Sequence, residues 1–206
     1  ASSGSSDQGR EVLFGDACSV TAIEYDENSP DIFFDGNSDG SGAKAIYVPE
    51  GGKRFPINDK SHIPILRDDG VVKSGTDVWL DGPRILNFSI NKPIDSVHYI
   101  LKQFNLKLED IYRFYFHQAN MMINKTINKK LKLTEERSPY SLRNFGNTSS
   151  TSVPITMCMD ANSHKDDNKL VLLCGFGIGL SWATIIMPIS KKQILPIQKV
   201  PKEYRA

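Results

Sequence analysis

The sequence lacks an excess of charge of either sign, because 25 lysines and arginines stand against 24 aspartates and glutamates. The resulting net charge of +1 creates no field that would favour nucleic acid or a membrane surface as a partner. Long apolar runs are also absent, and none approaches the roughly 20 residues needed to cross a bilayer. The first residues show neither the basic nor the apolar region of a signal peptide. We therefore expect a globular protein of the cytoplasm that binds neither nucleic acid nor membranes.

Cysteine is scarce, and the three thiols do not follow the spacing of a metal site. Cys18, Cys158 and Cys174 each stand among apolar or small residues, which predicts reduced and buried side chains. A glycine- and aspartate-rich stretch at 35–42 lacks the trailing glutamate of a calcium-binding loop. No metal site is therefore expected, and this stretch is interpreted as a structural loop.

Strand-like and helix-like patterns alternate along most of the chain, which predicts an α/β fold with a mixed sheet and helices on both of its faces. A continuous apolar run at 170–174 is typical of a strand buried on both sides. Asn91 and Pro93 mark the start of one helix. Strands are expected at 12–14, 17–25, 32–34, 45–48, 111–116, 140–145, 170–174 and 180–187. Helices are expected on either side of Pro93 within 79–104, and at 120–131 and 153–161.

Two polar side chains stand where short apolar runs end. His117 follows the run at 111–116, and Asn147 follows the run at 140–145. Strand ends are where α/β proteins place their chemistry, so the two side chains are expected to lie side by side. The alternatives are a histidine that only packs and an asparagine that only caps the helix beginning near Val153.

Five motifs in a fixed order together resemble the beta-ketoacyl-acyl-carrier-protein synthase III family, which has the thiolase-like fold. The resemblance runs from about Asp7 to Ile189 and covers the C-terminal half of the family fold with the end of its N-terminal half. The motifs are Leu13-Phe14-Gly15-Asp16-Ala17, Asp39-Gly40-Ser41-Gly42, His117-Gln118-Ala119-Asn120, Asn144-Phe145-Gly146-Asn147-Thr148-Ser149 and Gly175-Phe176-Gly177-Ile178-Gly179-Leu180-Ser181-Trp182.

The resemblance implies decarboxylative Claisen condensation of an acyl thioester with a malonyl thioester. It assigns catalysis to His117 and Asn147, and an oxyanion or acyl loop to Gly177, Ile178 and Gly179. It places Gly82, Asn120 and Phe176 beside the pantetheine arm of coenzyme A or of an acyl carrier protein. No cofactor is implied beyond these thioester substrates.

Among the departures of the sequence from the family, two concern the carrier and the nucleophile. Met122 stands where the family has an arginine that faces the carrier, and Lys125 could replace part of that charge. The nucleophilic cysteine of the family lies upstream of the motifs found here, and none of the three cysteines matches it. We therefore expect an N-terminal half to come from another chain, from another segment of a cleaved polypeptide or from sequence not included here. The complete enzyme is expected to form a homodimer and to meet an acyl carrier protein.

The resulting domain prediction is a linker at 1–6, the last strands of the N-terminal half at 7–30, the C-terminal half at 31–190 and an exposed tail at 191–206. Two other functions stay open at this point. One is acyl transfer to an alcohol or amine, with His117 as general base. The other is a noncatalytic subunit of a heteromeric synthase.

Overall fold

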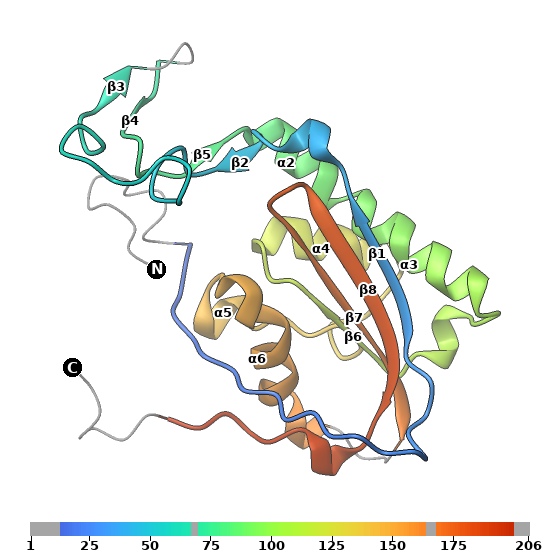
Figure 1. Ribbon diagram of the computed structural model, residues 1–206. Coiled ribbons are helices and arrows are strands. Elements are labelled where there is room, and N and C mark those ends of the chain that lie inside the picture. Colours follow the sequence, from blue (N-terminus) through green and yellow to red (C-terminus); the bar gives the residue numbers. More distant parts are fainter. Residues whose placement is uncertain (1–12, 67–69, 164–167, 200–206) are drawn as a thin grey trace.

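A four-stranded sheet forms the centre of the fold. The structure is a computed structural model that describes residues 13–66, 70–163 and 168–199. The strand order is β1-β8-β7-β6, and Figure 1 shows helices packed against it. Strand β6 runs parallel to β7, whereas β8 is antiparallel to both β7 and β1, so the expected mixed sheet is confirmed. The strands are β1 (Phe33–Ser38), β6 (Arg113–Phe116), β7 (Lys169–Gly177) and β8 (Ser181–Ile189).

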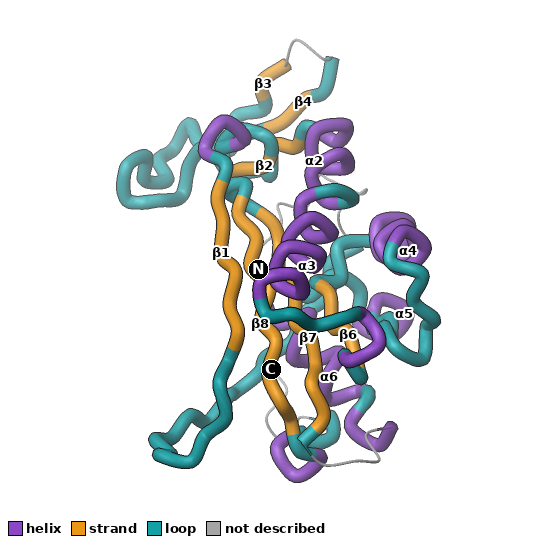
Figure 2. The backbone as a smooth tube through the Cα atoms, turned by 90° about the vertical axis from the view of Figure 1, so that its right-hand side faces the viewer, coloured by secondary structure: helices purple, strands orange, loops and turns teal. Residues whose placement is uncertain are grey.

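Helices cover both faces of this sheet, as expected. Helix α3 packs on β8, β1 and β7, whereas α6 packs on β6 and β7. The helices are α2 (Gly82–Ser89), α3 (Lys92–Gln103), α4 (Met121–Lys130), α5 (Leu142–Phe145) and α6 (Ser152–Met159). In Figure 2, α3 crosses in front of the strands, and β1 lies at the sheet edge remote from α6.

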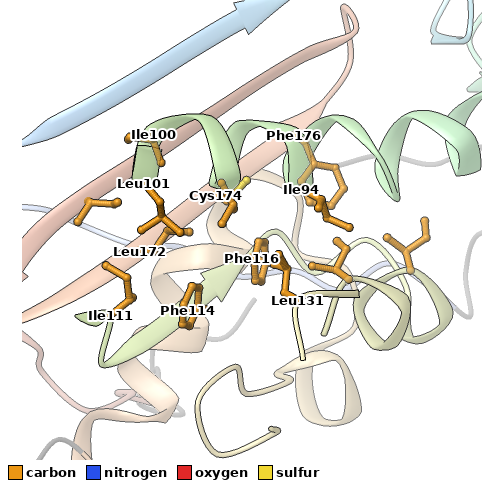
Figure 3. Close-up of a cluster of buried hydrophobic side chains, with 14 of the residues drawn as sticks. Ile94, Ile100, Leu101, Ile111, Phe114, Phe116, Leu131, Leu172, Cys174 and Phe176 are labelled. Atoms are coloured by element: carbon orange, nitrogen blue, oxygen red, sulfur yellow. The ribbon is translucent and has the colours of Figure 1, made fainter. Parts of the chain in front are cut away.

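Alternation along β6 divides its side chains between two cores. Phe114 and Phe116 are buried with residues of α3 and α4, in the cluster drawn in Figure 3. Tyr115 points to the other face, where it packs in the cluster that α6 closes. The expected burial of the 170–174 run on both faces is also confirmed, because Leu172 and Cys174 belong to the first cluster and Val171 to the second.

Helix α3 follows the pattern read from the sequence. Asn91 occupies the N-cap position and Pro93 lies in the first turn, where a missing N–H costs nothing. The buried positions recur at the spacing of one helix face, and they are Ile94, Val97, Ile100 and Leu101. This face packs on β8 and β7 and covers the first core.

A long excursion leaves the sheet after β1. Strand β2 (Ile46–Tyr47) pairs with β5 (Trp79–Leu80), and β3 (Ile65–Leu66) pairs with β4 (Val72–Lys73). Most of the side chains between β2 and β5 are exposed. The excursion ends at α2, which returns the chain to the first core through Phe88.

Three predicted elements differ from the structure. The strand expected at 17–25 is not formed, because the described residues offer it no neighbouring strand, and Val20 is 93% exposed. The strand expected at 140–145 is instead the single helical turn α5. Residues 35–38, expected in a loop, belong to β1 because they pair with β8.

The predicted segments at the two ends of the chain, 1–30 and 191–206, compare differently with the structure. Residues 1–6 and 7–12 lie outside the described residues. The last strands of an N-terminal half are expected at 7–30. In the described part of this range, the structure shows one isolated parallel bridge, between Phe14 and Asn147. The tail at 191–206 is not wholly exposed, because Ile194 is buried against the core under α6.

Candidate active site

His117 is the first residue after β6, and the fold holds both its backbone and its ring. Its N–H donates to the Cys174 carbonyl over 2.8 Å, which extends the β6–β7 pairing by one residue. Its ring nitrogen Nδ1 lies 2.7 Å from the Ser152 hydroxyl at the start of α6. The ring also meets Phe176 edge to face, with ring centroids 5.2 Å apart. His117 is therefore fixed in place by three contacts from two elements, β7 and α6.

Burial determines the charge of this histidine. Desolvation lowers the pKa of His117 to about 4, and a hydrogen bond with the Ser149 backbone raises it by less than burial lowers it. The imidazole is therefore neutral at pH 7. A neutral imidazole carries one N–H donor and one acceptor nitrogen, so His117 can donate a hydrogen bond without introducing charge.

Asn147 follows α5 and a glycine, not a strand. Gly146 adopts φ +64°, and a Cβ at this position would meet the Leu13 carbonyl oxygen at 2.8 Å. The backbone of Asn147 then pairs with the chain's beginning, because its N–H donates to the Leu13 carbonyl and its own carbonyl accepts from Gly15 N–H. This tight packing fixes the backbone position from which the Asn147 side chain extends.

The Asn147 side chain combines the two roles that the sequence left open. Its Oδ1 accepts the Ser149 N–H over 2.9 Å, which caps the turn leading into α6. Its Nδ2 donates to the Ala119 carbonyl over 3.1 Å, two residues after His117. A primary amide has two N–H groups, and the hydrogen bonds among the described residues use one of them. Asn147 therefore lies beside the His117 loop with one N–H available.

The glycine-rich loop joins β7 to β8 next to the histidine. It begins directly after Phe176, whose ring contacts His117. Gly179 adopts φ +137°, a conformation that favours glycine. Leu180 anchors the far end, because it exchanges two backbone hydrogen bonds with Asp39. Within the loop, Gly177 is half-buried, whereas Ile178 is 66% exposed.

Of the three residues assigned to pantetheine, Phe176 contacts the ring of His117. Gly82 begins α2, the helix whose Phe88 packs edge to face on Phe176. Asn120 caps α4, with its Oδ1 accepting the Ile123 N–H over 2.8 Å. The Oδ1 of Asn120 is therefore engaged in the helix cap in this structure.

Sequence reasoning assigned no role to three residues that hold this site together. Gln118 is buried and joins the Phe116 carbonyl to the Ser141 N–H. Asn124 donates from Nδ2 to the His117 carbonyl over 3.0 Å. Ser152 contacts the His117 ring. Gln118 could have been singled out from the sequence, because it is a polar amide inside the motif that begins at His117. The contact of Ser152 depends on a turn that the sequence pattern did not predict.

The described residues contain no group of three or more histidine, cysteine, aspartate or glutamate side chains placed to hold a metal ion. In the same part of the chain, no helix is long and apolar enough to cross a membrane.

Comparison with known proteins shows one family to which the chain is similar. Residues 101–189 match the model of the 3-oxoacyl-[acyl-carrier-protein (ACP)] synthase III C terminal region. The chain is 29% identical over 186 residues to the beta-ketoacyl-[acyl-carrier-protein] synthase III of Streptococcus agalactiae serotype III (strain NEM316). It is 31% identical over 187 residues to that of Clostridium perfringens (strain 13 / Type A). Both alignments cover 89% of this chain and 54% of the relative, so the chain spans about half the length of these curated relatives.

Solved structures agree with this result. A 3-oxoacyl-(acyl-carrier-protein) synthase III superposes with a TM-score of 0.69 at 27% identity, over 81% of this chain and 49% of that one. The 3-oxoacyl-(acyl-carrier protein) synthase of Burkholderia xenovorans LB400 gives 0.67 at 31% identity, over 79% and 45% of the two chains. The resemblance read from the motifs is confirmed: the chain is similar to the C-terminal part of the beta-ketoacyl-acyl-carrier-protein synthase III family and has a thiolase-like fold.

Proposed function

We propose that this chain supplies the carbanion-forming side of a decarboxylative condensing enzyme, in which His117 and Asn147 act on a malonyl thioester. The observation that carries this proposal is the pair of neutral donors on adjoining loops. His117 is uncharged because it is buried, and the Asn147 amide hydrogen-bonds to the carbonyl of Ala119, two residues from it.

The chemistry of decarboxylation needs this kind of site. Loss of carbon dioxide from a malonyl thioester leaves an enolate, whose negative charge collects on the thioester oxygen. Preoriented N–H donors stabilise such an oxyanion in a dry site, and removal of one typically costs about 3 to 4 kcal/mol. A neutral histidine and an asparagine can both donate N–H, and neither adds a charge that would bind the malonyl carboxylate in place of the oxyanion.

The nucleophile that carries the acyl group is proposed to come from an N-terminal half. A nucleophilic cysteine needs an accessible thiolate in an electropositive setting. Burial raises the pKa of the Cys174 thiol to about 12 and also raises that of Cys158. Cys18 is exposed, but it lies in a segment without regular structure, and its thiol contacts the Ser19 carbonyl at 4.0 Å. None of the three fits the requirement.

An uncovered part of the sheet offers a place for that half. Residues paired directly across strands share a face. Phe34 of β1 lies opposite Ile185 of β8, which lies opposite Leu173 of β7. Helix α6 covers the β7 end of this face, whereas Phe34 is 63% exposed. We propose that the N-terminal half covers this apolar surface and brings the cysteine to the site.

The carrier of the malonyl group is proposed to meet the exposed side of α4. Met122 is 58% exposed there, and Lys125 and Lys129 are exposed on the same helix. These lysines could attract an acidic acyl carrier protein. In the complete enzyme we expect the homodimer that the family resemblance implies.

Acyl transfer to an alcohol or amine is the weaker alternative. That reaction would use His117 as a general base, and a base works best when its pKa lies near the operating pH. Burial instead lowers the pKa of His117 to about 4. The ring is therefore better suited to donate a hydrogen bond than to accept a proton.

The experiment combines this chain with the N-terminal half of the same enzyme and supplies acyl and malonyl thioesters. Intact mass spectrometry follows acyl loading, and product analysis follows carbon dioxide and the 3-oxoacyl product. We expect one carbon dioxide for each 3-oxoacyl product. Acyl transfer without carbon dioxide would support the alternative. Condensation that survives loss of both His117 and Asn147 would assign this chain to a noncatalytic subunit.

A further inference from the structure

Segment 13–17 lies against the turn that carries Asn147, and it binds both backbone groups of that residue. The Asn147 N–H donates to the Leu13 carbonyl over 2.8 Å, and the Asn147 carbonyl accepts from the Gly15 N–H over 3.0 Å. These two bonds make the parallel bridge between Phe14 and Asn147. Buried backbone groups need such partners, and Asn147 is 8% exposed. Segment 13–17 therefore sets the backbone position of Asn147.

Gly15 is needed in this segment for space and not for its backbone angles. A Cβ at Gly15 would lie 1.8 Å from the Phe145 carbonyl oxygen and 3.0 Å from the carbonyl carbon. Gly15 does not adopt a positive φ, so alanine would fit its backbone angles. The obstacle is main chain, which cannot rotate aside as a side chain can. A side chain at position 15 must therefore push the two segments apart.

The crossing of the two segments is tight on its other side as well. A Cβ at Gly146 would meet the Leu13 carbonyl oxygen at 2.8 Å. One turn further on, the Thr151 hydroxyl donates to the Ala17 carbonyl over 3.3 Å. The side chains at 18–32 are then exposed. Segment 13–17 is therefore the packed part of this stretch, and it packs on the turn of Asn147.

His117 is held by other parts of the chain. Its N–H donates to the Cys174 carbonyl of β7, and the Ser152 hydroxyl of α6 lies 2.7 Å from its ring nitrogen Nδ1. Asn147, in contrast, has its backbone bound by segment 13–17. The two residues assigned to catalysis therefore depend on different supports, and a shift of segment 13–17 acts on Asn147 first.

We propose that segment 13–17 positions Asn147, with Gly15 as the positioning residue, and that an N-terminal half acts on Asn147 through this segment. Segment 13–17 lies within 7–30, the range expected to end that half. A shift of the segment moves the Asn147 backbone and, with it, the amide N–H that serves the reaction. Gly15 touches no substrate and acts through Asn147. The role of that N–H rests on the proposed function, whereas the positioning does not.

The first test needs neither a variant nor catalytic activity. Hydrogen exchange, measured by NMR on the whole chain, compares the N–H groups of Gly15 and Asn147. If one crossing holds both, they open together and are protected to the same extent. The N–H of Val20, in the exposed stretch, is the reference for an open amide. A Gly15 N–H that exchanges as freely as that of Val20 would overturn the proposal.

Substitution of Gly15 provides the second test. Gly15→Ala should shift the NMR signals of the Asn147 side-chain amide and leave those of the His117 ring unchanged. Gly52→Ala is the matched control, because Gly52 is exposed and a Cβ there meets no atom within 4 Å. Unchanged Asn147 signals in Gly15→Ala would overturn the proposal. Equal shifts at His117 and Asn147 would also overturn it, since they would show a general loss of packing.

Thr151→Val is the milder variant, which decides the question if Gly15→Ala does not fold. It keeps the branched shape of the side chain and removes the hydrogen bond to the Ala17 carbonyl. The same pattern is expected with smaller shifts, at Asn147 and not at His117. Asn147 signals that stay at their wild-type positions in Thr151→Val would then refute the positioning role.

Kinetics connect the position of Asn147 with the reaction. In the assembly with the N-terminal half, Gly15→Ala should lower kcat for carbon dioxide release about 100-fold, the loss that a displacement of about 1 Å can cause. KM should change little, because the Asn147 N–H acts in the transition state. Normal kcat with unmoved Asn147 signals would overturn the proposal. Normal kcat with displaced Asn147 signals would instead refute the proposed function of Asn147, while its positioning by Gly15 stands.

Discussion

The Ser141 N–H donates a hydrogen bond to Gln118 Oε1 over 3.1 Å, which joins the residue after His117 to the segment that leads to Asn147. The other end of the same amide donates to the Phe116 carbonyl over 2.9 Å. Gln118 is 1% exposed, so water cannot replace either bond. Gln118 is therefore one buried side chain that helps to set the spacing of the loops that carry His117 and Asn147.

Gln118→Ala should destabilise the protein and separate these loops. The substitution leaves the Ser141 N–H without its side-chain partner in the interior, and an unsatisfied buried group costs about 1 to 3 kcal/mol. Urea unfolding measures the change in the free energy of unfolding. The control is Gln103→Ala, an exposed glutamine at the end of α3, for which a change below about 0.5 kcal/mol is expected. Equal effects of the two substitutions would refute the role of Gln118.

Gly146→Ala should displace Asn147. The new Cβ would lie 2.8 Å from the Leu13 carbonyl oxygen, and φ +64° is a conformation that costs a residue with a side chain about 1 to 3 kcal/mol. Gly40→Ala is the control, because a Cβ there meets no atom within 4 Å. We expect a lower unfolding midpoint and a weaker condensation rate for Gly146→Ala alone. A fully active and equally stable Gly146→Ala protein would contradict this.

Stability should fall between pH 6.5 and about 4 because of His117. Burial lowers the pKa of the folded histidine from 6.5 to about 4, so the unfolded chain binds a proton in this window that the folded chain does not. The stabilisation is present above pH 6.5 and is lost as the pH falls toward 4, by about 3 kcal/mol in total.

His117→Gln should remove this part of the pH dependence, whereas His98→Gln, at an exposed position of α3, should not. Urea unfolding between pH 4 and pH 8 compares the slopes. Identical slopes for wild type and His117→Gln would show that His117 titrates normally in the folded protein.

The three thiols should differ in reactivity in a fixed order. Cys18 is exposed, Cys158 is half-buried and Cys174 is buried, and burial raises the pKa of Cys174 to about 12. Iodoacetamide at neutral pH should therefore modify Cys18 first and Cys174 only after unfolding, as peptide mass spectrometry would report. Rapid modification of Cys174 in the folded protein would contradict its assignment as an inert core thiol.

The buried run of β7, the helix face of α3 and the positions of His117 and Asn147 near each other could all be predicted from sequence. Each depends on local periodicity or on a motif with a chemical reason. Asn91 and Pro93 marked the start of α3 for the same reason.

The remaining errors arise where distant contacts decide the structure. Leu142 and Phe145 fit a strand by composition, but they are three residues apart, which also fits one helical turn, and that turn is what forms α5. Asp35 and Gly36 favour turns, yet pairing with Thr184 and Ala183 places them in β1. The strand expected at 17–25 finds no partner among the described residues.

The most direct measurement is the rate of carbon dioxide release from a malonyl thioester by this chain assembled with the N-terminal half. His117→Ala and Asn147→Ala should each lower that rate about 10²- to 10³-fold, the loss expected for one oxyanion donor. Acyl loading of the cysteine should stay within a fewfold of wild type, and His98→Ala and Asn144→Ala, both at exposed positions, should not change either step. Carbon dioxide release at the normal rate from His117→Ala would contradict the central claim that His117 stabilises the enolate.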